Sequence, residues 1–126
     1  MKIYEKALQG RSQSDFFALS KIAKITKNKS RIYFNHVAEE QLQLKNGSEI
    51  LMAKEGKRHF IAILNPTSEL TGYKVRRQSG KSGNYLAIQS PAFVTRVEIG
   101  LGVHTISGFA KYDSATKLDW YEIISE

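Results

Sequence analysis

Alternation of apolar and polar residues is the main pattern in the chain, and it is typical of short β-strands with one buried face. Between Ala23 and Thr26, apolar side chains alternate with cationic and polar ones, and Arg31–Phe34 is rich in β-branched and aromatic residues. Farther on, Glu49–Ala53 and His59–Leu64 flank the polar stretch Lys54–Lys57. This order predicts two short strands followed by a β-hairpin.

The same pattern returns in the second half of the chain. Tyr73–Arg76 alternates apolar and cationic residues, and the Gly- and Ser-rich stretch Ser79–Asn84 separates it from the apolar segment Tyr85–Ile88. Val103–Tyr112 and Leu118–Ser125 then flank a polar turn. We therefore expect a second pair of strands and a second hairpin.

Each half also carries signals for one short helix between its strands and its hairpin. Asn35 can cap a helix over His36–Leu44, and Gly47 can end it because glycine tolerates the left-handed conformation of a helix C-terminus. In the second half, Ser90 is a capping residue and Pro91 follows it at the first helical position. Both helices are predicted to be short.

Element order and spacing indicate an internal repeat of strand, turn, strand, short helix, glycine turn and hairpin. The copies are offset by 50 residues between Ile25 and Val75 and by 55 between Gly47 and Gly102. Because about 45 residues bury too little surface to fold alone, we expect the copies to share one core. The predicted fold is mainly β with short helices, a pseudo-twofold β-barrel built from two internal repeats. The expected parts are an N-terminal extension at 1–20, a first half at 21–64, a linker at 65–72 and a second half at 73–126, together one compact domain.

Composition supports a folded domain and excludes several kinds of chemistry. The chain has 126 residues, of which 41% are hydrophobic and 25% charged, so it can bury a core and lacks the bias of a disordered chain. The absence of cysteine rules out disulfides, thiolate zinc sites and cysteine nucleophiles. No apolar stretch approaches the roughly 18 residues of a membrane span, and the first 20 residues lack a signal-peptide pattern. We therefore expect a cytoplasmic protein with no membrane partner.

Positive charge is concentrated in two short stretches rather than spread along the chain. The formal net charge is +7, from 19 Lys+Arg against 12 Asp+Glu. Residues 21–31 contain five basic residues and residues 74–81 contain four, with no acid in either stretch, whereas the remaining residues include ten basic and twelve acidic ones. Solvated charged faces usually mix both signs, so this distribution favours binding of a polyanion.

Five segments carry a resemblance to a known family. In the first copy they are Lys24–Thr26, Arg31–Asn35 and Leu42–Ile50, and in the second Val75–Arg77 and Ser82–Pro91. Their residues and order resemble the AbrB/SpoVT/MazE-like family of swapped-hairpin β-barrels. The resemblance extends over residues 21–64 and 73–124.

This resemblance implies double-stranded DNA binding by a twofold unit made of two interlocked copies. Both copies lie in one chain here, so a monomeric pseudo-dimer can form the unit, with a homodimer as the alternative. The positions that match the DNA-binding strand and turn are Lys24, Lys27, Lys29, Arg31, Lys74, Arg76, Arg77 and Lys81. Arg76 and Arg77 are the best candidates for base contacts, because arginine offers a bidentate fork to guanine. The expected function is that of a sequence-preferring DNA-binding protein, a transcriptional or antitoxin-type regulator.

Two other readings of the basic stretches stay open. The chain could be a protein-binding or assembly module, of a mobile element or of toxin-neutralising type, whose basic stretches face an acidic partner. It could also bind single-stranded nucleic acid, with Tyr33, Tyr73 and Tyr85 stacking on bases. The same tyrosines also fit core or barrel-rim positions, and Trp120 fits a core anchor of the last strand.

No motif in the chain predicts an enzyme, a cofactor or a metal site. His36, His59 and His104 lack metal-ligand spacing, and we expect surface or capping roles for them. The segment Gly80–Gly83 resembles a phosphate loop, but Val75 stands where the first glycine of that motif belongs. We therefore expect a binding protein rather than a catalyst.

Overall fold

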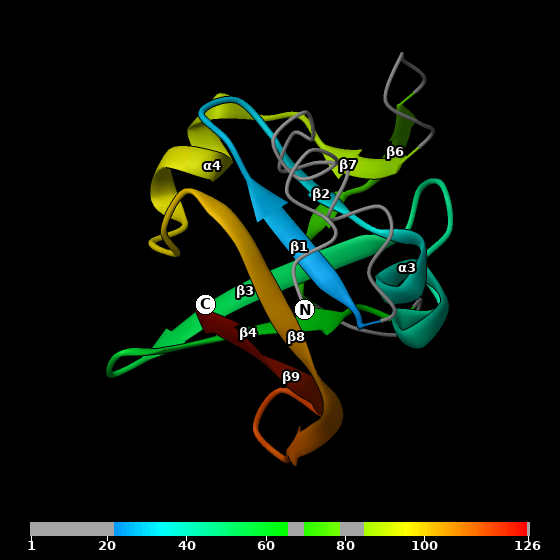
Figure 1. The fold of residues 1–126 in the computed structure, drawn as a ribbon. Helices are drawn as coiled ribbons and strands as arrows, with labels where there is room; N and C mark the ends of the chain where they lie inside the picture. Colours follow the sequence, from blue (N-terminus) through cyan, green and yellow to red (C-terminus); the bar gives the residue numbers. More distant parts are fainter. Residues whose placement is uncertain (1–21, 66–69, 79–84, 126) are drawn as a thin grey trace, which may run out of the picture.

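Nine antiparallel strands of the described residues form one sheet that curls into a nearly closed barrel (Figure 1). The computed structural model describes residues 22–65, 70–78 and 85–125. The strands are β1 (Lys24–Lys27), β2 (Ile32–Phe34), β3 (Glu49–Glu55), β4 (Arg58–Ile63), β5 (Tyr73–Lys74), β6 (Arg76–Gln78), β7 (Tyr85–Ile88), β8 (Gly102–Asp113) and β9 (Leu118–Ser125), and the helices are α3 (His36–Leu42) and α4 (Pro91–Arg96). The prediction of a mainly β barrel with short helices is confirmed.

The pattern of strand pairing has an internal twofold symmetry, in which each pair of strands has an equivalent pair when first-half and second-half strands are interchanged. The strand order is β5-β3-β4-β9-β8-β1-β2-β7-β6. β1 pairs with β2 as β6 pairs with β7, and the hairpin strand β8 pairs with β1 as β3 pairs with β5. The pairs β2–β7 and β4–β9 join one half to the other. Each hairpin therefore lies against the first strand of the opposite half. The extension at 1–20 and the centre of the linker, 66–69, lie outside the described residues.

The core lies inside the barrel and takes residues from both halves. Its largest fully buried side chains include Phe34, Ile25 and Ile50 from the first half and Leu86 and Ile106 from the second. Ala23 and Ile25 are buried as the period-two pattern predicted, but Thr26 is buried as well, and all four residues of β7 are buried. Neither half closes a core of its own in this arrangement.

The first helix starts where the sequence predicted but ends earlier. Asn35 is fully buried, and its Oδ1 accepts a hydrogen bond of 2.9 Å from the backbone N–H of Ala38. The helix stops at Leu42 because Gln43, with φ of 53°, takes the left-handed conformation expected at Gly47. The predicted end at Leu44 was therefore wrong by two residues.

The second helix also starts as predicted. Ser90 Oγ accepts a hydrogen bond of 3.3 Å from the N–H of Phe93, and Pro91 occupies the first turn. The helix ends at Arg96, and Val97 has extended backbone. Val97 and Ile99 lie in the chain that leads from α4 to β8.

Val75 splits the strand that was predicted at Tyr73–Arg76 into β5 and β6. Its backbone C=O accepts a hydrogen bond of 2.7 Å from the N–H of Gly47, and its N–H donates one of 2.8 Å to the C=O of Ser48. β5 can then pair with β3 while β6 pairs with β7. This corner brings the two ends of the sheet together, and its partners come from the opposite half of the chain.

The β3–β4 hairpin has a tighter turn than the sequence suggested. The register runs to the pair Glu55–Arg58, so Gly56 and Lys57 alone form the turn in place of the expected Lys54–Lys57. Gly56 has φ of +63°, which glycine adopts without strain. In the described part of the chain, no helix has the length and apolar character needed to cross a membrane.

Candidate nucleic-acid interface

Four neighbouring strands, β1, β2, β7 and β6, form a layer whose outer face carries several of the predicted site residues. The registers align Thr26 with Tyr33, Tyr33 with Ala87, and Ala87 with Arg76. Directly paired residues project from the same face of a sheet. The row from Thr26 to Arg76 therefore lies on one face, which we call the outer face of the layer. Within this row Arg76 is exposed and Tyr33 is half-buried, whereas Thr26 and Ala87 are buried.

Lys24 and Arg31 belong to the same face because each stands two residues from a member of this row. Lys24 lies two residues before Thr26 on β1, and Arg31 lies two residues before Tyr33, immediately before β2 begins at Ile32. Successive side chains of a strand point to opposite faces, so residues two apart share a face. The intervening Ile25 and Ile32 are fully buried in the barrel core. The face thus presents cations from both basic stretches.

Lys24 is held on this face by a neighbouring strand. Its Nζ donates a hydrogen bond of 2.8 Å to Oγ1 of Thr105 on β8. Lys29 lies in the exposed turn between β1 and β2, where Asn28 Oδ1 accepts hydrogen bonds from the N–H groups of Ser30 and Arg31. The side chain of Asn28 therefore shapes the turn that carries Lys29.

Lys27 points away from the outer face and serves a structural purpose. Its Nζ donates to the carbonyl oxygens of Val97 and Ile99, the latter at 2.8 Å. These carbonyls follow the C-terminal end of α4, where a cation is favourable because the helix dipole is negative there. Lys27, one of the residues predicted to contact DNA, thus links the first half of the chain to the second.

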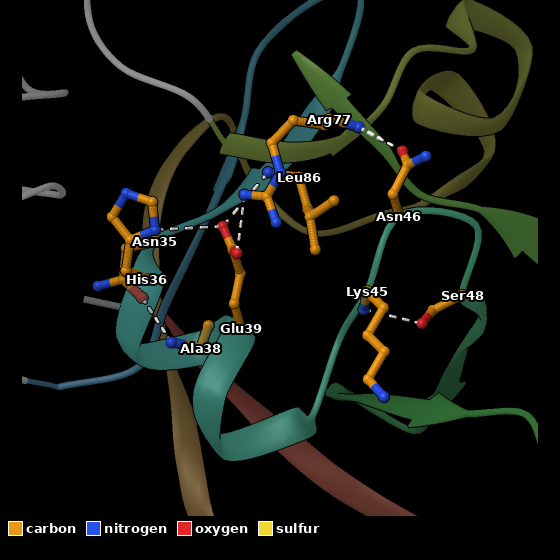
Figure 2. Close-up of polar contacts among 9 residues, drawn as sticks. All are labelled: Asn35, His36, Ala38, Glu39, Lys45, Asn46, Ser48, Arg77 and Leu86. Carbon is orange, nitrogen blue, oxygen red and sulfur yellow. Dashed lines mark hydrogen bonds and ion pairs between the residues drawn. The ribbon is translucent and has the colours of Figure 1, made fainter. Parts of the chain in front are cut away.

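Arg77 has the corresponding structural position in the second half (Figure 2). Its Nη1 donates a hydrogen bond of 2.9 Å to Oε1 of Glu39 on α3, and its backbone N–H donates one of 2.8 Å to Oδ1 of Asn46. Glu39 Oε2 lies 3.4 Å from the N–H of Leu86 and 3.5 Å from Nδ1 of His36. The carboxylate of Glu39, only 12% exposed, therefore joins α3 to β6 and β7.

Sequence reasoning missed Glu39 and Asn46 as partners of the basic stretch. Glu39 could not be found from local pattern, because its partner Arg77 is 38 residues away in the sequence. The alternation of side chains between the two faces of each strand does distinguish the structural cations from those on the outer face. Lys27 and Arg77 each stand one residue from an outer-face position, whereas Lys24 and Arg76 stand on that face.

The eight predicted residues therefore fall into distinct groups. Lys24, Arg31 and Arg76 share the outer face, and Lys27 and Arg77 hold the helices. Among the predicted residues that the structure describes, Lys29, Arg31, Lys74 and Arg76 have side chains that form no hydrogen bond or ion pair with described residues. Lys81, together with the predicted turn Ser79–Asn84, lies outside the described residues.

The tyrosines near the basic stretches are partly covered. The rings of Tyr33 and Tyr85 lie 6.1 Å apart between centroids, and His36 lies 5.3 Å from Tyr85, which is only 8% exposed. Burial raises the pKa of Tyr33, and the positive charge of Arg31 acts in the opposite direction. The phenol of Tyr33 therefore stays protonated and can donate a hydrogen bond at the outer face. Tyr73 packs on Phe93, with 3.9 Å between ring centroids.

The histidines do not assemble a metal site in the part of the chain that the structure describes, where no group of three or more His, Asp or Glu side chains comes together. His104 is only 5% exposed, and its Nε2 lies 2.6 Å from the carbonyl oxygen of Gly100. The expectation of a surface or capping role was therefore wrong for His104. Its place opposite Ile25 in the β1–β8 ladder explains the burial.

Trp120 was expected in the core but lies on the outside of the barrel. It pairs with Ala62 on one side and Lys111 on the other, and its Nε1 donates a hydrogen bond of 3.0 Å to Thr116 Oγ1. With Phe60 and other residues it lines a surface groove of about 290 Å³. The inward positions of β9 belong to Tyr121 and Ile123 instead.

No family model, no curated protein and no solved structure matches the chain in the three comparisons made. A function for this chain must therefore be argued from the chemistry and geometry of its own residues.

Proposed function

We propose that the protein binds double-stranded DNA through the outer face of the β1-β2-β7-β6 layer and acts as a transcriptional or antitoxin-type regulator. The observation that carries the proposal is the common face of Lys24, Arg31 and Arg76, which come from the two basic stretches of the sequence. Cations on one face neutralise phosphates and release their counterions, which is the main source of affinity for a duplex.

The four-stranded layer is wider than one duplex groove. Adjacent strands lie about 4.8 Å apart, so the ends of the row from Thr26 to Arg76 are separated by about 14 Å. The major groove of B-DNA is about 12 Å wide and admits a two-stranded β-ribbon, so two of the four strands can enter it while the flanking strands face the phosphates. Because β2 and β7 are antiparallel, Arg31 just before β2 and Tyr85 at the start of β7 lie at opposite ends of the layer. Contacts from both ends can then straddle the groove.

Two arginines supply the contacts that can distinguish bases. The guanidinium groups of Arg31 and Arg76 form no hydrogen bond or ion pair in the described part of the chain, so they are available to a ligand. An arginine fork can donate to O6 and N7 of guanine, whereas lysine is a less directional donor. The resemblance to the AbrB/SpoVT/MazE-like family, which implies DNA binding by the first strand and turn of each copy, supports the same face.

Fluorescence anisotropy with a labelled random-sequence duplex tests the proposal across a salt series. Wild-type affinity should fall steeply with salt, and Arg31→Gln and Arg76→Gln should each reduce the log–log slope by about 0.9 if one phosphate contact is lost. Lys57→Gln removes the same charge from the β3–β4 turn and is the matched control, for which the slope should not change. A wild-type protein that binds no duplex at low salt would contradict the proposal.

Single-stranded DNA provides the competing outcome. The alternative interpretation needs Tyr33, Tyr73 and Tyr85 to be available for stacking, but Tyr85 is 8% exposed and Tyr73 packs on Phe93. We therefore expect weaker binding of oligo-dT than of duplex at equal salt. Tighter binding of oligo-dT would favour the single-strand function over the duplex function. Selection from a random duplex pool would then define the preferred sequence.

A further inference from the structure

Strand β8 extends well beyond the neighbour that pairs with it. β1 pairs with β8 from Gly102 to Thr105, and the C=O of Ala23 just before β1 accepts a hydrogen bond from the N–H of Ile106, whereas β8 continues to Asp113. On its other side, β8 pairs with β9 up to the pair Asp113–Leu118. Among the described residues, the distal part of β8 therefore has one edge without a strand partner.

The start of this edge is already occupied. Gln41 on α3 donates a hydrogen bond of 2.8 Å to the carbonyl oxygen of Ser107, so α3 adjoins this end. The register shifts between Ile106 and Ala110, and the N–H and C=O of Phe109 both bond to Ser107 Oγ within this bulge. The regular edge that can still accept a strand is Ala110–Asp113.

Large apolar side chains are exposed beside this edge. Phe109 is 87% exposed and Tyr112 is 61% exposed. Proteins often protect a free edge with a β-bulge or a lysine side chain. This edge has both, namely the bulge between Ile106 and Ala110 and the side chain of Lys111. An exposed phenylalanine on the bulge does not serve that protection, since it adds apolar surface next to unpaired backbone groups.

We propose that the β8 edge is a homodimer interface, in which two copies of this chain pair their β8 strands antiparallel about a twofold axis at Tyr112. A twofold axis perpendicular to the sheet leaves each side chain on the same face of the sheet in both copies. Paired residues must project from the same face, so one residue on the axis has to pair with the same residue of the second copy. The choice among the residues of the free edge then follows from charge.

Charge selects the register within Ala110–Asp113. Pairing centred on Lys111 would oppose two lysines, which is unfavourable. Pairing centred on Tyr112 places Lys111 opposite Asp113 of the second copy, and the symmetry repeats this opposite-charge pair. It also places Phe109 opposite Ala115 in the turn of the second copy, which covers the exposed ring. The segment is thus self-complementary, which argues for a second copy rather than a different protein.

The position of this edge is compatible with the DNA-binding face. In Figure 1 the turn between β8 and β9 lies at the bottom of the view, whereas the β1–β2 turn and β7 lie at the top. A dimer formed through β8 leaves the outer face of the β1-β2-β7-β6 layer open. The proposed interface does not depend on the proposed function, and the two can be tested separately.

Sedimentation velocity over a concentration series tests the charge pair. The wild type, of 14.2 kDa per chain, should reach twice that mass as its concentration rises. Lys111→Glu places glutamate opposite aspartate and should leave a monomer, whereas Lys111→Arg should still dimerise. Lys57→Glu makes the same charge change on the other hairpin and should behave as the wild type. Equal circular dichroism spectra would show that the variants fold.

A single introduced thiol tests the register directly, because the natural chain has no cysteine. Residues facing each other across antiparallel strands have Cα atoms about 4.5–5.5 Å apart, within the roughly 4.4–6.8 Å that a disulfide spans. Tyr112→Cys should therefore form a disulfide dimer under mild oxidation. Ser114→Cys, with its two copies separated by roughly 14 Å in this register, should not.

Three outcomes would overturn the homodimer. One is a wild type that stays monomeric at every concentration, which would leave the edge to a strand from another protein. Another is a dimer that Lys111→Glu does not weaken. The last is a disulfide that forms as readily with Ser114→Cys as with Tyr112→Cys.

Discussion

Nζ of Lys27 on β1 lies 2.8 Å from the carbonyl oxygen of Ile99, in the segment that follows α4. Arg77 on β6 forms the reciprocal link, because its guanidinium group pairs with Glu39 on α3. Each half of the chain thus uses a cation from its own basic stretch to hold the helix region of the other half. The basic side chains of the two stretches therefore form a structural group and a solvent-facing group.

Replacing Lys27 with methionine should destabilise the fold. Lys27→Met leaves the carbonyl oxygens of Val97 and Ile99 without their charged donor. Hydrogen bonds to a charged group contribute about 1.5–3 kcal/mol, so we expect the free energy of unfolding to fall by about 2 kcal/mol. Urea unfolding monitored by Trp120 fluorescence measures it. Lys29→Met, in the exposed turn, should change stability by no more than about 0.5 kcal/mol, and equal effects of both variants would refute the structural role.

Glu39 and Arg77 should show a coupling in a double-mutant cycle. Glu39→Gln removes the carboxylate that faces Arg77, the N–H of Leu86 and His36. Because the Arg77 side chain is 37% exposed, water screens the pair, and we expect a coupling free energy of about 0.5–1 kcal/mol with Arg77→Met. Chemical denaturation of the two single variants and the double variant gives the value. Strict additivity would mean that the ion pair contributes nothing to the link between the halves.

Asn35 should be the most sensitive of the helix caps. Its Oδ1 accepts hydrogen bonds from the N–H groups of Ala38 and Lys24, and its Nδ2 donates to the carbonyl oxygen of Ile22. Asn35→Ala loses the cap and leaves buried backbone groups unpaired, which should cost about 3 kcal/mol. Ser90→Ala, at the cap of α4, removes a single capping bond and should cost about 1 kcal/mol. The order of the two melting temperatures tests this expectation, and the reverse order would contradict it.

Asp113 should make the β8–β9 turn sensitive to acid. Hydrogen bonds from the hydroxyl and N–H of Thr116 lower the pKa of Asp113 below its ordinary value of 3.8. A carboxylate whose pKa is lowered by folding stabilises the fold above its unfolded pKa, and that contribution disappears as the pH falls through the folded pKa. Asp113→Asn should therefore be less stable than the wild type at pH 6, and the difference should narrow below pH 3.8.

Thermal unfolding of the two proteins between neutral and acidic pH checks the direction. Asp119→Asn removes an exposed acid from the same hairpin and serves as the control for charge alone. A difference between Asp113→Asn and the wild type that stays constant down to the lowest pH would show that the carboxylate charge is not responsible.

Local patterns were sufficient to predict most elements of the fold. The alternation at Ala23–Thr26, the paired apolar segments of each hairpin and the Ser90-Pro91 helix start act within a few residues, and the structure contains each element. The split of Tyr73–Arg76 at Val75 could not be predicted in this way. It depends on hydrogen bonds to Gly47 and Ser48, which belong to the other half of the chain.

The sequence was sufficient to predict which charged residues belong to the candidate site, but not how their side chains are arranged. Charge clustering identified Arg31 and Arg76, and the register then placed both on the same face. The structural use of Lys27 and Arg77 depends on partners 72 and 38 residues away, and no local pattern identifies such partners. The free edge of β8 was also hidden in the sequence, because the length of a strand does not show how much of it a neighbour covers.

The exchange of hairpins between the halves has a consequence for how the molecule unfolds. β8 pairs with β1 of the first half, and β3 pairs with β5 of the second half. The pairs β2–β7 and β4–β9 also join one half to the other. Melting of either half removes the strand neighbours and core partners of the other, so no intermediate with one intact half is expected. The chain should therefore lose its structure in one cooperative step, at a temperature that its least stable half determines for the whole barrel.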